Sequence, residues 1–243
     1  MAGTSLTPTT RAALPLAFLI AAALFGCAGS QATPGSSTIA TPTVVGTVEL
    51  DPALIDEVVP LTQALVRARA ENPPGRERAV AELIAARLRA AGVEAELRAF
   101  AGPERVNLLA VLPGSNRTLP PLLLMGHSDV VPADAADWSS PPWAGLHVGD
   151  RVVGRGVIDM LGMVALQTLT LVALKDAGVP LERDVVLLIE GDEEADGAGV
   201  EAALRDWPAV RGAWAVLTEG GFLLEDYLRP GEDIAAISIA EKG

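Results

Sequence analysis

The sequence predicts a three-layer α/β domain, and two observations carry this prediction. Short unbroken apolar runs at residues 122–125 and 185–189 are typical of parallel strands that are buried on both faces. Segments of helical length and apolar periodicity alternate with such runs along the chain. Ligands of an open α/β sheet bind outside the carboxyl ends of its strands. The residues that follow each strand are therefore the first candidates for a functional site.

Composition supports a folded domain and argues against two classes of partner. Half of the 243 residues are apolar, which is enough for a sizeable core. The formal net charge of -13 arises from 31 acidic and 18 basic residues. Such a charge disfavours binding to nucleic acid and electrostatic docking on anionic lipid. It favours the binding of cations instead.

Residues 1–26 have the features of a secretory signal peptide. Arg11 is the only charged side chain before an apolar run at residues 12–25, which is too short to span a bilayer. Leu24-Phe25-Gly26-Cys27 resembles the lipobox of bacterial lipoproteins, where cleavage leaves the cysteine to be lipidated. We therefore expect an exported protein of the bacterial cell envelope that is lipid-anchored at Cys27. A plain signal peptide with an incidental thiol is the alternative.

The rest of the chain divides into a tether and a domain. Residues 27–50 are rich in Ser, Thr, Gly and Pro without an apolar period, which predicts a flexible tether. Residues 51–243 then form the domain. Asp51 and Pro52 predict the start of a helix that Pro60 kinks or interrupts. A second helix has apolar residues at 80, 83, 84, 88 and 91 and ends at Gly92.

The strands are predicted from their patterns of burial. Residues 93–99 alternate between apolar and charged, as in a strand near a sheet edge, and residues 107–112 form the next strand. A short strand at 151–153 precedes Asp159, which lies at the start of an apolar helix that runs to about Asp176. Strands at 185–189 and 213–217 follow, and residues 233–243 are predicted to form one more strand.

His127 and Asp129 follow the first buried run and have the spacing of a metal ligand with its hydrogen-bond partner. Gly126 is expected to end that strand. In an extended backbone the side chains at i and i+2 point the same way, so the Asp129 carboxylate can reach the ring nitrogen that His127 does not use for metal. A structural histidine is the alternative for His127, and a solvated loop is the alternative for the acidic run at 190–194.

Electrostatics indicates what a convergence of the later carboxylates would require. If Asp159, Glu194 and Glu219 lie about 5 Å apart, each pair repels by roughly 3 kcal/mol at an effective dielectric constant of about 20. Three pairs approach roughly 10 kcal/mol, which is the order of a whole domain's stability. Two divalent cations would neutralise the cluster. A mixed shell of histidine and carboxylates suits Zn, with Co or Mn as possible replacements.

Four segments carry a resemblance to a known family. MGHSDVVPAD, GRGVIDM, GDEEADGAG and LTEGG, in this order and at these intervals, resemble the metal-site motifs of the M20 family of dinuclear metallopeptidases and deacylases. The resemblance covers roughly residues 54–243. It implies a three-layer α/β/α, zinc-peptidase-like catalytic domain with a mixed, largely parallel sheet that is incomplete at its C-terminus. It also implies hydrolysis of amide bonds in small peptides or N-acyl amino acids, as carboxypeptidases and aminoacylases of the family perform it.

The resemblance also implies a role for each candidate residue. Four residues would be metal ligands: His127 and Glu219 on one ion, Glu194 on the other, and Asp159 bridging both. Asp129 would orient His127. Glu193 would be the general base, which takes a proton from the metal-bridging water and passes it to the leaving amine.

Two features depart from the family pattern. Leu161 occupies the place where the family usually has Lys, and the family's fifth ligand, a His far downstream, has no counterpart. His147 is the only other histidine, and we expect it to be structural or at the surface. We further expect the chain to be the front part of a longer protein that ends where a lid domain begins. By itself it would then be marginally stable and nearly inactive.

Two other functions fit part of the pattern. An M28-type aminopeptidase shares the His-x-Asp and Glu-Glu layout, although GRGVIDM around Asp159 favours M20. The chain could also be a catalytically inactive, lipid-anchored protein that binds metal or peptide. Glu193 discriminates here, because a binding site does not need a general base and a hydrolase does.

The lipid anchor can be tested with Cys27→Ser. We expect the wild-type protein to fractionate with membranes and the Cys27→Ser variant to be released, because the serine hydroxyl cannot take the place of the lipidated thiol. Cell fractionation with immunoblotting measures this, and Ser30→Ala in the same segment is the control. A Cys27→Ser protein that still partitions with membranes would place the anchor elsewhere.

Overall fold

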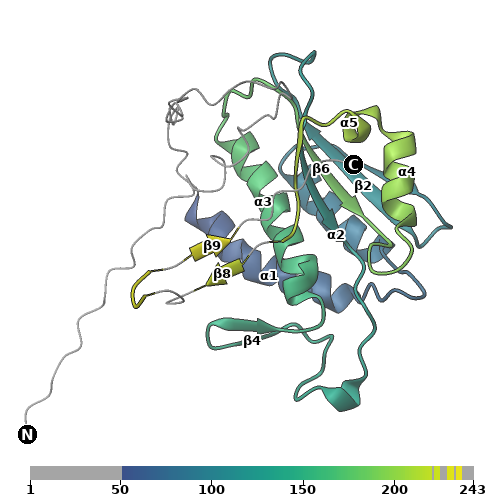
Figure 1. Ribbon diagram of the computed structural model, residues 1–243, viewed down its shortest axis with the longest axis vertical. Coiled ribbons are helices and arrows are strands. Elements are labelled where there is room, and N and C mark those ends of the chain that lie inside the picture. The colour runs from purple at the N-terminus through teal and green to yellow at the C-terminus, as the bar shows by residue number, and fades with distance from the viewer. Residues whose placement is uncertain (1–50, 221, 225–228, 233, 237–243) are drawn as a thin grey trace, which may run out of the picture. The chain divides into compact units, whose positions relative to one another are not determined.

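The computed structural model describes residues 51–220, 222–224, 229–232 and 234–236. A five-stranded mixed sheet with the order β1-β2-β6-β3-β7 forms the centre of the domain (Figure 1). Its strands are β1 (Ala95–Ala99), β2 (Val106–Leu112), β3 (Leu122–His127), β6 (Val185–Glu190) and β7 (Ala215–Leu217). β2 pairs antiparallel with β1 and β6, whereas β3 pairs parallel with β6 and β7. The strands that carry predicted site residues therefore all run in the same direction.

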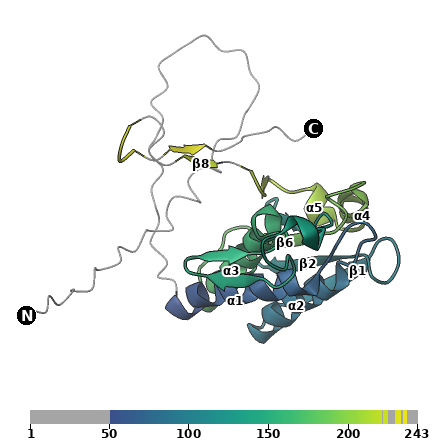
Figure 2. The same ribbon diagram turned by 90° about the horizontal axis from the view of Figure 1, so that it is seen from below.

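Helices cover both faces of the sheet and make the predicted three layers. One face is covered by α1 (Pro52–Ala68), α2 (Arg78–Ala90) and α3 (Gly162–Asp176), and the other by α4 (Ala198–Asp206) and α5 (Pro208–Arg211) (Figure 2). Alternate residues of β6 face the two layers: Leu187 and Ile189 pack with the first, and Val186 and Leu188 with the second. This double burial is the physical reason for the unbroken apolar run in the sequence.

Helix α1 corrects the prediction for Pro60. The helix starts as predicted, because the Asp51 side chain accepts a hydrogen bond from the Ala53 amide at 2.9 Å. It then continues through Pro60 to Ala68 rather than being interrupted. Proline removes the hydrogen bond to the carbonyl of Asp56, but Asp56 and Pro60 both lie on the exposed side, where water can satisfy that carbonyl. Burial of the following turns, including Leu61 and Leu65, stabilises the helix beyond the proline.

Helix α2 and strand β1 confirm their sequence patterns with one exception. Gly92 follows α2 with φ +72°, a conformation that glycine adopts at little cost, and it ends the helix as predicted. β1 lies at the edge of the sheet, as its alternation of apolar and charged residues predicts. The exception is Leu83, which belongs to the predicted apolar face of α2 but is 38% exposed.

Gly126 has a different role from the predicted one. It does not end β3, since the strand includes His127. A Cβ atom at Gly126 would lie 3.0 Å from Val164 and 3.2 Å from Met160, so the missing side chain lets α3 and the segment before it pack closely on the strand. The glycine therefore serves helix–sheet packing directly beside His127.

The segment at 157–176 is long and strongly apolar. Among the described residues it is long and apolar enough to span a membrane by length and composition, and just over half of it is buried inside the domain. Its first turn, η4 (Val157–Leu161), has non-helical φ/ψ at Asp159 and Met160, so Asp159 lies just ahead of the regular helix α3. Leu171 and Val172 of α3 are fully buried in the core, which identifies α3 as a core helix.

Smaller elements complete the described structure. Two hairpins are formed by β4 (Leu146–Val148) with β5 (Arg151–Val153) and by β8 (Phe222–Leu224) with β9 (Ile234–Ala236), and η3 (Ala135–Asp137) is a short helical turn. The strand predicted at 151–153 is thus confirmed. Of the strand predicted at 233–243, only 234–236 belong to the described residues. The predicted signal peptide, Cys27 and the tether lie outside them.

Leu187→Ala tests the importance of the double-sided burial of β6. Leu187 is fully buried, so we expect the substitution to lower the free energy of unfolding by about 2–5 kcal/mol through lost burial and the cavity that it leaves. Urea denaturation measures the change. The half-exposed Leu83→Ala is the control and should cost less than about 1 kcal/mol. Equal losses in the two variants would contradict the described core.

Candidate metal centre

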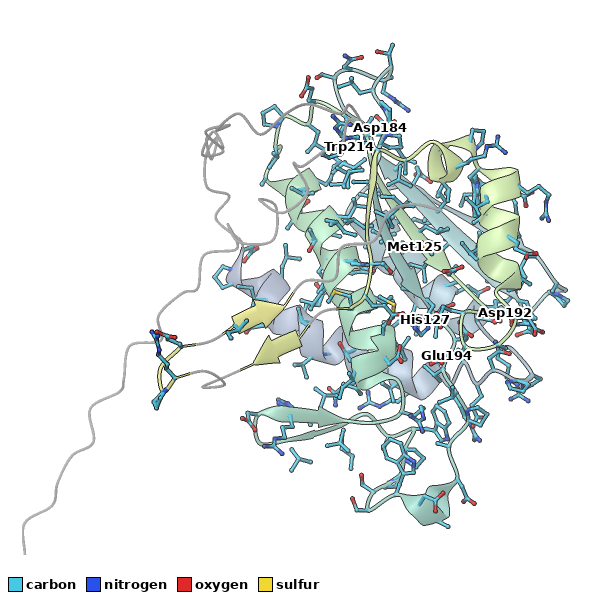
Figure 3. The ribbon with its side chains drawn as sticks, viewed as in Figure 1. Met125, His127, Asp184, Asp192, Glu194 and Trp214 are labelled. Carbon is cyan, nitrogen blue, oxygen red and sulfur yellow. The ribbon has the colours of Figure 1, made fainter. Side chains whose placement is uncertain are left out.

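The predicted site residues gather at the carboxyl ends of the three parallel strands. His127 is the last residue of β3, residues 191–194 follow β6, and Glu219 follows β7. Figure 3 shows His127, Asp192 and Glu194 together at this end of the sheet, and Asp184 and Trp214 at the opposite end. Asp159 joins the group from η4. The parallel pairing of β3 with β6 and β7 thus brings together residues that are far apart in the sequence.

The His127 ring is buried and its two nitrogens have different partners. Nδ1 lies 2.9 Å from the backbone carbonyl oxygen of Asp129, which can only accept, so Nδ1 carries a proton. Nε2 lies 2.9 Å from Oδ1 of Asp159 and 3.7 Å from Oε2 of Glu219. Nε2 therefore faces carboxylate oxygens across a gap that a proton or a metal cation can occupy.

Asp159 and Glu219 complete this three-residue group. The ligand atoms of His127, Asp159 and Glu219 all lie within 4.8 Å of one another. Only His127 is buried, whereas the Asp159 and Glu219 side chains are 63% and 39% exposed. The group thus has a buried imidazole at its base and two carboxylates that a substrate can reach.

The pKa values in the group are shifted by burial and by the neighbouring charges. Burial alone would lower the pKa of His127, but the hydrogen bond to the Asp129 carbonyl and the Asp159 carboxylate together raise it. Burial raises the pKa of Glu219, and repulsion from Asp159 adds to this effect against the opposing influence of His127. Burial and Asp159 likewise raise the pKa of Glu194. A cation in the group would relieve these carboxylates.

The donor set fits a divalent transition metal. One imidazole nitrogen and two carboxylate oxygens form a shell that suits Zn, and a proton on Nδ1 leaves Nε2 free to bind a metal. The Asp129 carbonyl holds the ring in this tautomer, as hydrogen-bond partners of metal-binding histidines commonly do.

The Asp129 carboxylate does not make the contact that the sequence suggests. Its Oδ1 is 3.8 Å from Nδ1 of His127, beyond hydrogen-bond distance, and the backbone carbonyl orients the ring instead. The carboxylate accepts hydrogen bonds from the backbone amides of Glu193 at 3.2 Å and Glu194 at 3.1 Å. Asp129 is therefore bound to the loop after β6 by its side chain and to His127 by its main chain.

Glu193 and Glu194 lie beside the three-residue group but outside it. Glu193 is exposed and Glu194 half-buried. The carboxylate of Glu194 is close enough to Asp159 and His127 for both to influence its pKa. The structure thus places both glutamates at the predicted end of the sheet, next to the predicted ligands.

Glu190 is a buried carboxyl group that the sequence analysis did not single out. It is the last residue of β6, pairs in register with His127, and is only 2% exposed. Its Oε2 atom has no hydrogen-bond partner within the described structure. Burial raises its pKa to about 8. Its position within an apolar strand end could be read from the sequence, but its burial could not.

Sequence reasoning also missed a set of polar residues that adjoin the site. Asn72 donates from Nδ2 to Oδ2 of Asp129 and to Oδ1 of Asp192, both at 2.8 Å. Arg105 pairs with Asp192 and, at 3.2 Å, with Glu77. Asn72, Glu77 and Asp192 are buried. No spacing pattern links these residues in the sequence, because they come from loops and helix ends that only the fold brings together.

The remaining predicted residues have simple positions. His147 lies exposed on β4, away from the three-residue group that the described residues form. Leu161, in the place of the family's usual Lys, is buried in the apolar core that α3 shares with the sheet. An apolar side chain suits this position because a buried Lys would need a partner for its charge.

The fold and the site together define a three-layer α/β domain with a histidine and carboxylate group that could hold a metal ion at the carboxyl ends of its parallel strands. Residues 123–234 match the sequence profile of peptidase family M20/M25/M40. Over these residues the chain is similar to this family.

Two relatives and one solved structure illustrate the similarity. The chain is 36% identical over 146 residues to human N-fatty-acyl-amino acid synthase/hydrolase PM20D1, covering 58% of this chain and 28% of that protein. It is 35% identical over 161 residues to succinyl-diaminopimelate desuccinylase of Methylobacterium radiotolerans, covering 65% and 40%. The M20 family metallo-carboxypeptidase Sso-CP2 from Sulfolobus solfataricus has the same fold, with a TM-score of 0.58, 24% identity, and coverage of 68% and 37%. The chain thus spans less than half the length of each.

Glu190→Gln tests the buried carboxyl group beside His127. A folded-state pKa of about 8, against an ordinary value of 4.5, favours the protonated form, so its contribution to stability is present below about pH 4.5 and lost as the pH rises through 8. In metal-free protein we expect Glu190→Gln to match the wild type near pH 4.5. At pH 8.5 it should be more stable by up to about 4–5 kcal/mol, at about 1.4 kcal/mol per pKa unit.

Urea denaturation with chelator present, repeated between pH 4.5 and 8.5, measures this difference. The exposed Glu182→Gln is the matched control and should change stability by less than about 0.5 kcal/mol throughout. A Glu190→Gln effect that is the same at both ends of the pH range would mean that Glu190 is not a buried acid.

Proposed function

We propose that the chain carries the metal centre of an M20 hydrolase that cleaves amide bonds in small peptides or N-acyl amino acids. The observation that carries this proposal is the convergence of His127, Asp159 and Glu219 within 4.8 Å at the carboxyl ends of parallel strands. The match of residues 123–234 to the M20 profile and the hydrogen bond from the Glu193 backbone amide to Asp129, next to His127, support the same conclusion.

Two divalent ions, with Zn favoured over Co or Mn, would occupy the centre. His127 and Glu219 would hold one ion, Glu194 the other, and Asp159 would bridge them. Burial, with a smaller contribution from repulsion by Asp159, raises the pKa values of Glu194 and Glu219, and a cation bound between these carboxylates would offset both effects. Bound ions supply a water of lowered pKa and polarise the substrate carbonyl.

Glu193 would act as the general base. Its side chain is exposed, and its backbone amide is held by the Asp129 carboxylate at 3.2 Å, so the side chain is free to reach the substrate from a fixed main-chain position. It would take a proton from the attacking water and pass it to the nitrogen of the leaving amine as the amide C–N bond breaks. His127 would remain a ligand throughout, since its Nδ1 proton is engaged by the Asp129 carbonyl.

The class of substrate rests on the relatives. One acts, by its name, on N-fatty-acyl amino acids, one on a succinylated diamino acid, and the solved structure is a carboxypeptidase. An amide bond close to a carboxylate is common to these names. The match to the M20 profile favours this class over an M28-type aminopeptidase.

The cellular location is proposed from the sequence alone. The signal-like residues 1–26 and Cys27 support export to a bacterial cell envelope with a lipid anchor. The substrates would then be small peptides or acylated amino acids outside the cytoplasm, and the lipid would be the contact with the membrane.

Glu193→Gln distinguishes a hydrolase from a protein that only binds metal or peptide. In the protein as its gene encodes it, we expect the variant to keep its metal and to lose roughly 10²–10⁴-fold in turnover, because the base is removed and the ligands are spared. Elemental analysis of the purified protein and hydrolysis of N-acyl amino acids measure the two properties.

His127→Ala is the matched comparison and should lose bound metal as well as activity. Activity of Glu193→Gln within about tenfold of the wild type would remove the proposed base. A wild-type protein that binds metal but hydrolyses nothing would favour the binding function.

A further inference from the structure

We propose that Asn72 is a positioning residue of the metal centre, which sets the loop carrying Glu193 and Glu194 relative to His127. This rests on the proposed metal centre and adds to it a residue that touches neither metal nor substrate. The basis is a buried polar network that runs from the start of α2 to the amides of the two glutamates.

Asn72 is held in place by its main chain. Its amide donates to the carbonyl of Val130 at 2.9 Å, and the Val130 amide donates to the carbonyl of Ala70 at 3.0 Å. The segment after α1 is thereby fixed beside the segment that follows His127. From this position the Asn72 side chain extends to two carboxylates at once.

The side-chain amide of Asn72 lies between two carboxylates that would otherwise repel each other. Nδ2 donates to Oδ2 of Asp129 and to Oδ1 of Asp192, both at 2.8 Å, and all three side chains are buried. A buried carboxylate without donors is costly, and each donor here serves one of them. The same Asp129 carboxylate accepts hydrogen bonds from the backbone amides of Glu193 and Glu194. The Asn72 side chain therefore determines where those amides bind.

The far side of the network is fixed independently of the metal centre. Asp192 also pairs with Arg105 and receives the Ala198 amide at 3.0 Å, which fixes both ends of the loop between β6 and α4. Asp192 has φ +70°, a conformation that is uncommon for a residue other than glycine and that these contacts maintain. Gly75, with φ +84°, leaves room for the Arg105 side chain, since a Cβ there would overlap the guanidinium.

Asn72 differs from an ordinary structural asparagine in what it orders. Asn107 is equally buried, but its side chain binds the main chain of Gly191 and Gly199 and no carboxylate. Asn72 acts on Asp129, whose main chain holds the His127 ring and whose side chain holds Glu194. Loss of the Asn72 side chain should therefore lower the affinity for the ion that Glu194 binds more than the affinity for the ion of the three-residue group.

Metal affinity in a double-mutant cycle tests the proposal. Zn²⁺ binding is measured by competition with a chromophoric chelator in the wild type, Asn72→Ala, Glu194→Gln and the double variant. We expect Asn72→Ala to lower the affinity for the ion that Glu194 binds by about 10- to 100-fold and the affinity for the other ion by less than about threefold. In the Glu194→Gln background, where that ion's ligand is already lost, Asn72→Ala should cause no further loss.

Further variants separate positioning from loss of folding. Asn72→Ser keeps one donor and should lie between the wild type and Asn72→Ala. Arg105→Met should lower the affinity for the same ion. The control is Arg87→Met, which removes a comparable ion pair with Glu57 between α1 and α2 and should leave that affinity unchanged. Urea denaturation of each protein shows whether it is folded, so the comparison can be restricted to folded variants.

The outcomes distinguish this inference from the proposed function. Two bound ions in the wild type and unchanged affinities in folded Asn72→Ala, Asn72→Ser and Arg105→Met would overturn the role of Asn72 and leave the metal centre intact. Equal weakening of both ions, or a further loss in the Glu194→Gln background, would show a merely structural role. A wild-type chain that binds no Zn²⁺ would overturn the metal centre and this inference with it.

Discussion

Repulsion among carboxylates at one edge of the sheet is the constraint on which the rest of the structure depends. Asp129, Asp159, Glu190, Glu194 and Glu219 lie at or near this edge, and burial, together with repulsion from neighbouring carboxylates, raises the pKa values of the last three. Such a cluster is tolerated only where the surrounding fold is stable by other means. The sheet provides this stability, because β6 is buried between helices on both faces and β3 is packed closely against α3 at Gly126.

Hydrogen-bond donors are distributed unevenly around the cluster. Two buried carboxylates, Asp129 and Asp192, accept hydrogen bonds from Asn72 and from main-chain amides, and Asp192 also pairs with Arg105. Asn72 and Arg105 together lower the pKa of Asp192 against the opposing effect of burial. The more exposed carboxylates, Asp159 and Glu219, have instead the Nε2 atom of His127. Asp129 and Asp192, which accept several hydrogen bonds, thus support the loop after β6. Asp159 and Glu219, whose charges have fewer partners, face the place where metal would bind.

Much of the fold could be predicted because its signals are local. Continuous apolar runs identified β3 and β6, alternation identified β1 as an edge strand, and a cap with a first-turn proline identified the start of α1. Pro60 and Gly126 were misread for a shared reason. In both cases tertiary packing outweighs the local preference of the residue. Burial of the turn after Pro60 stabilises the helix beyond it, and Gly126 lets α3 approach the strand closely.

The sequence by itself located His127, Asp159, Glu194 and Glu219 after strands or at a helix start, and parallel strands end at a common edge. The resemblance of four motifs to the M20 family then singled out these four residues as candidate metal ligands. Only the tertiary structure decided how Asp129 acts, since its carboxylate lies 3.8 Å from the His127 ring and binds the loop amides instead. Only the tertiary structure revealed Asn72 and Arg105. Hydrogen bonds between residues 57 and 87 positions apart leave no periodic trace in a sequence, and they exist only once the chain has folded.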